Sequence, residues 1–169
     1  GRLMYGRRDP GGWALETPDA TPQAGQYVSI ALAPEPRLSY YVASTGELRY
    51  AERLAGAWSV QVVDATGIAG MYSSLALESG NPRIAYFDAR NEALKYAFRN
   101  GGIWTLETVD PGPGLGLHAS LSVVGGVPRI AYYDALRADP KLATRSGSTW
   151  TTEVVESAGN AGQYASLVV

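Results

Sequence analysis

A repeat of about 46 residues runs through this 169-residue chain and constrains its fold more than any other feature. The four tryptophans mark the repeat, since they are spaced by 45, 46 and 46 residues. A glycine, an aromatic residue and a serine keep the same three intervals. The four sets are Trp13, Trp58, Trp104 and Trp150; Gly25, Gly70, Gly116 and Gly162; Tyr27, Tyr72, His118 and Tyr164; and Ser29, Ser74, Ser120 and Ser166. Such regular self-similarity predicts a repeat architecture.

Each period contains four short segments rich in Tyr, Val, Ile, Leu and Trp, separated by Gly, Asn, Pro or Asp. In the middle copy these segments cover residues 72–77, 83–88, 94–98 and 58–63, and none shows sustained helical spacing. A strict four-strand repeat of this length is typical of propeller blades. The sequence therefore predicts an all-β fold, a β-propeller built of four-stranded antiparallel blades.

Residues 83–89 (RIAYFDA) and 129–135 (RIAYYDA) are two copies of one strand, with apolar or aromatic side chains on both faces. This pattern is expected of a sheet that packs against neighbours on both sides, as stacked blades do. An L-x-Y unit follows, at 94–96 in one copy. In the next copy the sequence predicts that Leu142 and Thr144 take the places of its leucine and tyrosine, after a two-residue insertion.

The predicted domain organisation is a single propeller unit over residues 1–169. With the serine-bearing strand innermost, complete blades lie at about 25–63, 70–109 and 116–155, and a shared blade takes its outer strands from 3–17 and its inner strand from 164–169. These segments make 15 strands, or about 3.75 blades.

Propellers usually close with about 4 to 8 blades, and an open end exposes strand edges that invite association. Three solutions follow from the strand count. A second copy closes a ring of about eight blades as a homodimer, the remainder of a longer chain supplies the missing blades, or the chain closes on itself with four blades. The first of these is the expected partner arrangement.

The repeat, written W…G-x-Y-x-S-L…P-R-I-A-Y-Y-D…L-K-Y-A, resembles the four-stranded blades of bacterial β-propellers of the broad sialidase-like type. The resemblance covers essentially the whole chain at the level of blade architecture. The sialidase Asp-box, S-x-D-x-G-x-x-W, is missing, as are the tryptophan-aspartate and kelch patterns. The resemblance therefore implies a scaffold and carries no activity with it.

Composition excludes several classes of function. The 14 basic and 16 acidic residues leave a net charge of −2, so no overall basic field attracts nucleic acid or an anionic membrane. The absence of cysteine excludes disulfides and thiolate chemistry. No apolar run of about 18 residues and no charged leader is visible. We expect no nucleic-acid or membrane partner, and a secreted or cell-surface location in a bacterium is slightly favoured.

Acidic residues recur where the predicted strands end in loops on one face of the disc. They are Asp19, Asp64, Asp110 and Glu156 after the outermost strands, and Asp88 and Asp134 after the second strands. Arginines such as Arg37, Arg83 and Arg129 fall on the opposite face. The functional interpretation is an acidic ring that binds a cation such as Ca²⁺, a glycan or a basic partner. The structural interpretation is that these carboxylates bond turn amides and that the arginines bridge blades.

His118 replaces the repeat's tyrosine in one copy only. A lone histidine lacks the further Cys or His ligands of a zinc site, so we expect a structural variant or a ligand contact near the ring axis. A catalytic site is asymmetric, as in the carboxylate pair of a glycosidase, whereas the acids, arginines and tyrosines here recur in every blade. We therefore expect a non-catalytic scaffold or ligand-binding module, with carbohydrate as the candidate ligand and no required cofactor.

Two alternatives to this function stay open. The chain is a piece of a larger glycosidase-like or sialidase-like propeller whose catalytic residues lie elsewhere, or it is an engineered or excised propeller fragment without a ligand.

Overall fold

The computed structural model describes residues 1–168, which form 14 strands and no helix. All strand pairs are antiparallel, in one two-stranded hairpin and three four-stranded sheets. The strands are β1 (Leu3–Asp9), β2 (Gly12–Asp19), β3 (Ala24–Leu32), β4 (Pro36–Val42), β5 (Glu47–Leu54), β6 (Ala57–Asp64), β7 (Ala69–Glu78), β8 (Asn81–Asp88), β9 (Ala93–Asn100), β10 (Ile103–Asp110), β11 (Leu115–Val124), β12 (Val127–Asp134), β13 (Asp139–Ser146) and β14 (Thr149–Val154). The prediction of an all-β chain with repeated four-stranded antiparallel sheets is confirmed.

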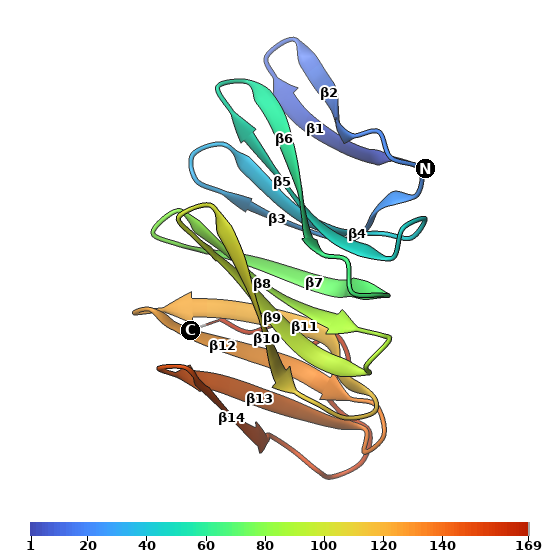
Figure 1. Ribbon diagram of the computed structural model, residues 1–169, viewed down its shortest axis with the longest axis vertical. Coiled ribbons are helices and arrows are strands. Elements are labelled where there is room, and N and C mark those ends of the chain that lie inside the picture. The colour runs from blue at the N-terminus through green and yellow to red at the C-terminus, as the bar shows by residue number, and fades with distance from the viewer. Residues whose placement is uncertain (169) are drawn as a thin grey trace.

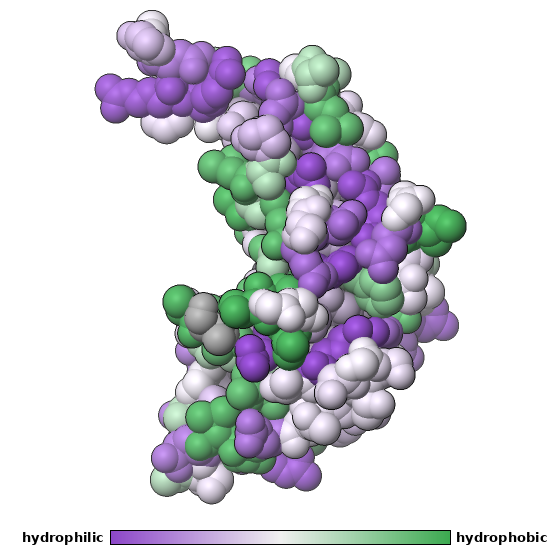
Figure 2. Space-filling view, turned by 90° about the vertical axis from the view of Figure 1, so that its left-hand side faces the viewer, coloured by the Kyte–Doolittle hydropathy of each residue, from purple (hydrophilic) through white to green (hydrophobic). Residues whose placement is uncertain are grey.

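Each four-stranded sheet is a simple meander, in the orders β3-β4-β5-β6, β7-β8-β9-β10 and β11-β12-β13-β14. The sheets follow one another along the longest axis of the molecule, with the hairpin β1-β2 at one end and β14 at the other (Figure 1). Seen from the side, the molecule curves around a hollow (Figure 2). The two ends do not meet, so the described residues form an open arc and not a closed four-bladed monomer.

The hydrophobic core lies between neighbouring sheets. One cluster joins Leu94 and Tyr96 of β9 to Leu121 of β11 and Ile130 and Tyr132 of β12. Two equivalent clusters fill the preceding gaps between sheets. Strand β8 is buried along nearly its whole length because it has a neighbouring sheet on each face, which explains the apolar residues on both faces of RIAYFDA.

The strand register corrects one prediction. Ala85 pairs with Tyr96, and the equivalent Ala131 pairs with Leu142. Leu142, and not Thr144, therefore occupies the position of the repeated tyrosine, and the spacing remains 46 residues with no insertion. The pattern is hard to recognise in this copy because Pro140 stands where the other copies have the leucine of L-x-Y.

The C-terminal segment differs from the predicted strand at 164–169. Residues 164–168 pair with no strand, and residue 169 lies outside the described residues. The Leu167 amide nevertheless donates to Ser120 Oγ at 3.0 Å, just as the Leu121 amide donates to Ser74 Oγ at 3.0 Å. The segment thus lies beside β11 as β11 lies beside β7. It forms no ladder because residues 1–168 place no further strand beside it.

The repeated glycines mark the closest approach between neighbouring sheets. A Cβ atom on Gly70 would lie 2.8 Å from Leu48 Cα, and one on Gly116 would lie 2.7 Å from Leu94 Cα. Both glycines have positive φ angles, +112° and +105°. Only glycine combines this backbone conformation with so close an approach, so these positions fix how each sheet packs on the one before it.

Candidate functional site

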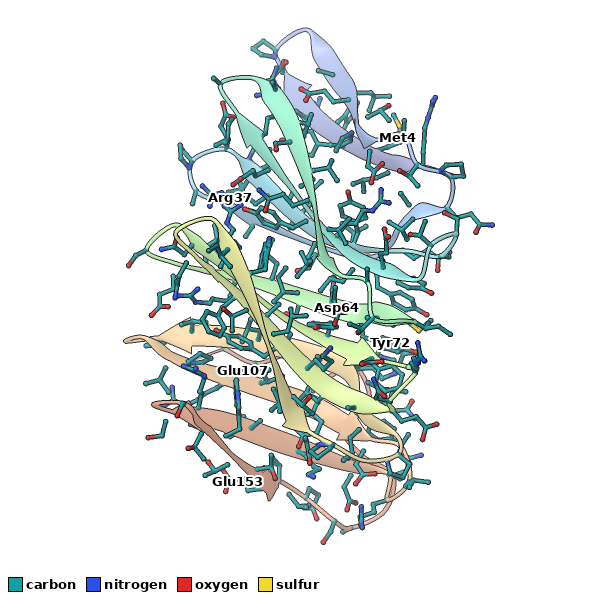
Figure 3. All side chains as sticks on the ribbon, viewed as in Figure 1. Met4, Arg37, Asp64, Tyr72, Glu107 and Glu153 are labelled. Carbon is teal, nitrogen blue, oxygen red and sulfur yellow. The ribbon has the colours of Figure 1, made fainter. Side chains whose placement is uncertain are left out.

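A row of aromatic side chains runs along the innermost strands of the three sheets and the C-terminal segment. It contains one residue from each innermost position, namely Tyr27, Tyr72, His118 and Tyr164 (the aromatic row). Successive ring centroids lie 4.7, 4.5 and 4.0 Å apart. Together with the residue that follows each ring, they surround a space of about 280 Å³. Tyr72 and Arg37 lie at opposite ends of the strands (Figure 3), so the row is near the rim away from that arginine.

The backbone of the row explains its arrangement. All four residues are in the left-handed region, with φ between 52° and 58°. The ladders of β3, β7 and β11 each shift register twice here, once just before the aromatic position and once across it. A bulge of this kind redirects a side chain, and here it places each ring against the ring of the neighbouring sheet. A left-handed non-glycine residue costs about 1–2 kcal/mol, and the fold retains it in every copy.

A second layer of rings supports the aromatic row from behind. Tyr41, Phe87 and Tyr133 are buried, and each lies 6.4 Å from its partner in the row, measured between ring centroids. Burial lowers the pKa of His118 and raises the pKa of Tyr72. Both rings are therefore neutral at pH 7, and the row presents an uncharged aromatic surface with hydroxyl and imidazole edges.

The predicted acidic residues at the ends of the outermost strands join neighbouring sheets. Asp64 of β6 is 2% exposed and accepts hydrogen bonds from Tyr86 Oη at 2.7 Å and Lys95 Nζ at 2.6 Å, both in the next sheet. Asp19 bonds Tyr40 and Arg49 in the same way, and Asp110 bonds Tyr132 and Lys141. We call this repeated contact the Asp–Tyr joint.

The Asp–Tyr joint keeps the carboxylates of Asp64 and Asp19 charged. Burial alone raises the pKa of Asp64, but donors from Lys95, Thr66 and Tyr86 outweigh it and hold the pKa at about 2. The pKa of Asp19 is lowered by the same balance, with burial opposed by Thr21, Tyr40 and Arg49. These aspartates are thus anions whose acceptor capacity is used inside the protein.

The other predicted acids close their own loops. Asp88 accepts from the amides of Arg90 and Asn91, and Asp134 accepts from the amides of Leu136 and Arg137. Glu156 is exposed and accepts from the amides of the two residues that follow it, which lowers its pKa.

Of the predicted ligand-binding residues, His118 is the one that borders the space beside the aromatic row. Over residues 1–168, no three His, Cys, Asp or Glu side chains gather closely enough to hold a metal ion.

A second repeated contact involves residues that the sequence interpretation did not select. Glu16 of β2 accepts both Arg53 and Trp58 Nε1 of the next sheet, and Glu107 of β10 accepts Arg145 and Trp150 in the same way. We call this contact the Arg–Trp joint. Its acceptor positions are Glu16, Gln61, Glu107 and Glu153, which keep the intervals of 45, 46 and 46 residues. The periodicity could have revealed them, but the change to Gln61 obscures the pattern.

The fold and contacts define an all-β protein of stacked four-stranded sheets, held together by joints that repeat from one sheet to the next. No protein-family model matches this chain, and no curated protein is similar to it in sequence. The part of the chain that the structure describes has no helix of the length and hydrophobicity needed to cross a membrane.

Proposed function

We propose that this chain is half of a β-propeller and serves as a non-catalytic scaffold whose ring closes by self-association. The three four-stranded sheets are its blades. The segment 164–168 has the place of the innermost strand of a fourth blade, and β1 and β2 have the places of its two outer strands. Two copies joined end to end then make a ring of eight blades, two of them with three strands.

The observation that carries this proposal is the repetition of the joints. The same contacts connect β1-β2 to the first blade, the first blade to the second, and the second to the third. A set of units related by one repeated contact continues until it closes or is capped. Here the arc ends with its contact groups exposed, so a further blade edge is required on each side.

The oligomeric state tests this proposal. Size-exclusion chromatography with light scattering should give twice the chain mass of 17.9 kDa. A species that remains a monomer across micromolar concentrations would contradict self-association.

A ligand-binding role rests on a separate observation, the aromatic row. Exposed aromatic rings with polar edges bind the apolar faces and hydroxyl groups of sugars, and strained backbone is often retained at binding sites. We assign no catalytic pair to the carboxylates, because they recur in each blade and already accept hydrogen bonds in the joints or in their own loops. We therefore propose glycan binding without hydrolysis.

A glycan array tests this role, first with Ca²⁺ and then with a chelator. We expect binding in both conditions, and loss of binding in Tyr72→Ser. The matched control is Ile103→Ser, because Ile103 is exposed in the β9–β10 hairpin and lies outside the aromatic row. Absence of binding to any glycan would contradict the ligand-binding role and leave the scaffold role alone.

A further inference from the structure

We infer that the partner at the open ends is a second copy of this chain, docked head to tail through the Arg–Trp joint: Glu153 of one copy receives Arg8 and Trp13 of the other. This inference rests on the proposed function and specifies which residues of the two copies meet. The ends of the arc carry the two halves of a contact that the protein already forms at each internal junction.

The internal junctions show what the joint requires. Glu107 accepts Arg145 Nε at 3.0 Å, Arg145 Nη2 at 2.7 Å and Trp150 Nε1 at 2.9 Å. Trp150 also packs edge to face on Tyr96, with 5.2 Å between ring centroids. The bidentate pairing fixes the orientation of the guanidinium, so each joint sets both the distance and the tilt between two neighbouring blades.

In the middle junction, too, the arginine is paired with a full negative charge. The acceptor there is the neutral Gln61, which takes Trp104 Nε1 at 2.9 Å and Arg99 Nη1 at 3.1 Å. Glu52, on the neighbouring strand of the same sheet as Gln61, then pairs with Arg99 through both carboxylate oxygens at 2.9 Å. Where the acid is missing from its usual position, another acid replaces its charge.

The register places Glu153 at the same position in the third blade. It pairs across the ladder with Leu142, as Glu107 pairs with Tyr96. Glu153 is exposed, and the blade that would supply its arginine does not occur within residues 1–168. Figure 3 shows Glu153 at the end of the molecule opposite Met4.

The N-terminal hairpin carries the complementary half. Arg8 and Trp13 are cross-strand partners, as are Arg53 and Trp58 in the first blade. Trp13 is 69% exposed, whereas Trp58 is partly buried against the preceding hairpin. Within the described part of the chain no sheet precedes this hairpin, so the Arg–Trp pair has no acceptor there.

A second pair of groups supports the same register. The hydroxyl of each inner-strand serine accepts the amide of the next inner strand, as in Ser29 with Leu75. Ser166 at one end and the amide of Ile30 at the other occupy the equivalent positions without a neighbour in residues 1–168. Both residues are exposed. The joint and the serine contact thus specify one alignment of the two copies.

Hydrophobic residues also gather at the two ends. The exposed large apolar side chains there include Met4, Trp13, Leu15, Ile30 and Leu32 on the N-terminal side, and Val154, Val155, Tyr164 and Val168 on the C-terminal side. Apolar surface of this kind marks an interaction site. Association of the two ends buries it and provides affinity, while the Arg–Trp joint provides specificity.

A charge exchange tests this inference. A two-copy ring contains two identical junctions, so Glu153→Arg alone places two arginines at each junction and Arg8→Glu alone places two glutamates there. In a mixed dimer of the two variants, every junction regains one acid and one base. We expect each variant alone to associate at least about tenfold more weakly than the native chain, and the mixture to recover near-native affinity as a heterodimer.

Native mass spectrometry distinguishes the heterodimer from either homodimer after one variant is isotopically labelled. Glu92→Arg is the matched control, since Glu92 is an exposed acid in the β8–β9 loop of the middle blade, and it should dimerise like the native chain. Thermal unfolding of each variant as a monomer checks that it folds. A native chain that stays monomeric overturns the proposed function itself. Native and variant chains that dimerise equally overturn only the Arg–Trp register.

Discussion

At the scale of single residues, hydrogen-bond donors from the following sheet set the pKa of the buried carboxylates that join the sheets. A carboxylate buried alone has a raised pKa and is destabilising. Asp64 is almost fully buried, yet its pKa is about 2 because it lies between a tyrosine hydroxyl and a lysine ammonium of the next sheet. Its charge is thus part of the contact between the two blades.

The pH dependence of stability follows from this pKa. The native protein binds the Asp64 proton less readily than the unfolded chain, whose pKa is near 3.8, so protonation favours unfolding. The contribution, on the order of 2 kcal/mol, is complete above the unfolded pKa and is lost as the pH falls towards about 2. Asp19, Glu16 and Glu107 have lowered pKa values and act in the same direction.

Urea unfolding at pH 7 and pH 3 measures this effect in the native chain and in Asp64→Asn. The variant is less stable at pH 7 because Lys95 loses the nearer of its two counter-ions, at 2.6 Å, and keeps only Asp88, at 3.7 Å. We expect the difference in unfolding free energy between the two proteins to narrow by on the order of 1 kcal/mol at pH 3. Glu92→Gln is the control and should show no such narrowing. An unchanged difference between native and Asp64→Asn would show that folding does not lower the pKa of Asp64.

At the scale of elements, the sequence predicts the repeated four-stranded sheets well, because strand composition, turn residues and period all agree. It determines the C-terminal segment less well, since a strand needs a partner and residues 164–168 have none in the described chain. The register of β13 was mispredicted because Pro140 and Leu142 replace the leucine and tyrosine that identify the third strand elsewhere.

The candidate site was only partly predictable for a related reason. The sequence shows that Asp64 ends a strand but not that its partners are Tyr86 and Lys95, which lie 22 and 31 residues later in another sheet. The aromatic row depends on bulges and left-handed backbone at Tyr72 and its equivalents. Tyrosine has no intrinsic preference for that conformation, so tertiary packing imposes it.

The inner-strand glycines give a prediction at this scale. In Gly116→Ala, the new methyl group would lie 2.7 Å from Leu94 Cα, at a φ of +105°. Neither backbone can move without separating two blades, so we expect a loss of more than about 3 kcal/mol in unfolding free energy. The control Gly102→Ala has a similar φ of +88° but nothing within 4 Å. It should lose only about 1–2 kcal/mol, and equal losses in chemical denaturation would show that close packing at Gly116 does not matter.

At the scale of the whole molecule, the fourth junction of the proposed ring differs from the three internal ones. At the position where the internal junctions have the aspartate of the Asp–Tyr joint, this junction has Glu156. The position equivalent to Arg49, Lys95 and Lys141 is occupied by Met4, which precedes Tyr5 as Arg49 precedes Tyr50. The second strand that carries the tyrosine is absent from the shared blade. The Asp–Tyr joint is therefore lost there, and the proposed contact between the two copies consists of the Arg–Trp joint, the serine contact and the apolar side chains of the two ends.

Restoring the missing cation should strengthen this junction. In Met4→Lys, the new ammonium takes the position that Lys95 and Lys141 occupy inside the arc, and it faces Glu156 of the other copy. We expect the dissociation constant of the dimer, measured by analytical ultracentrifugation, to fall by a few-fold, since an exposed ion pair contributes little. Met4→Gln matches the size without the charge and should leave the constant unchanged. In the double variant Met4→Lys, Glu156→Gln the gain should disappear. A gain that survives the loss of Glu156 would mean that the lysine acts elsewhere, and that the two ends do not meet in the alignment of the internal blades.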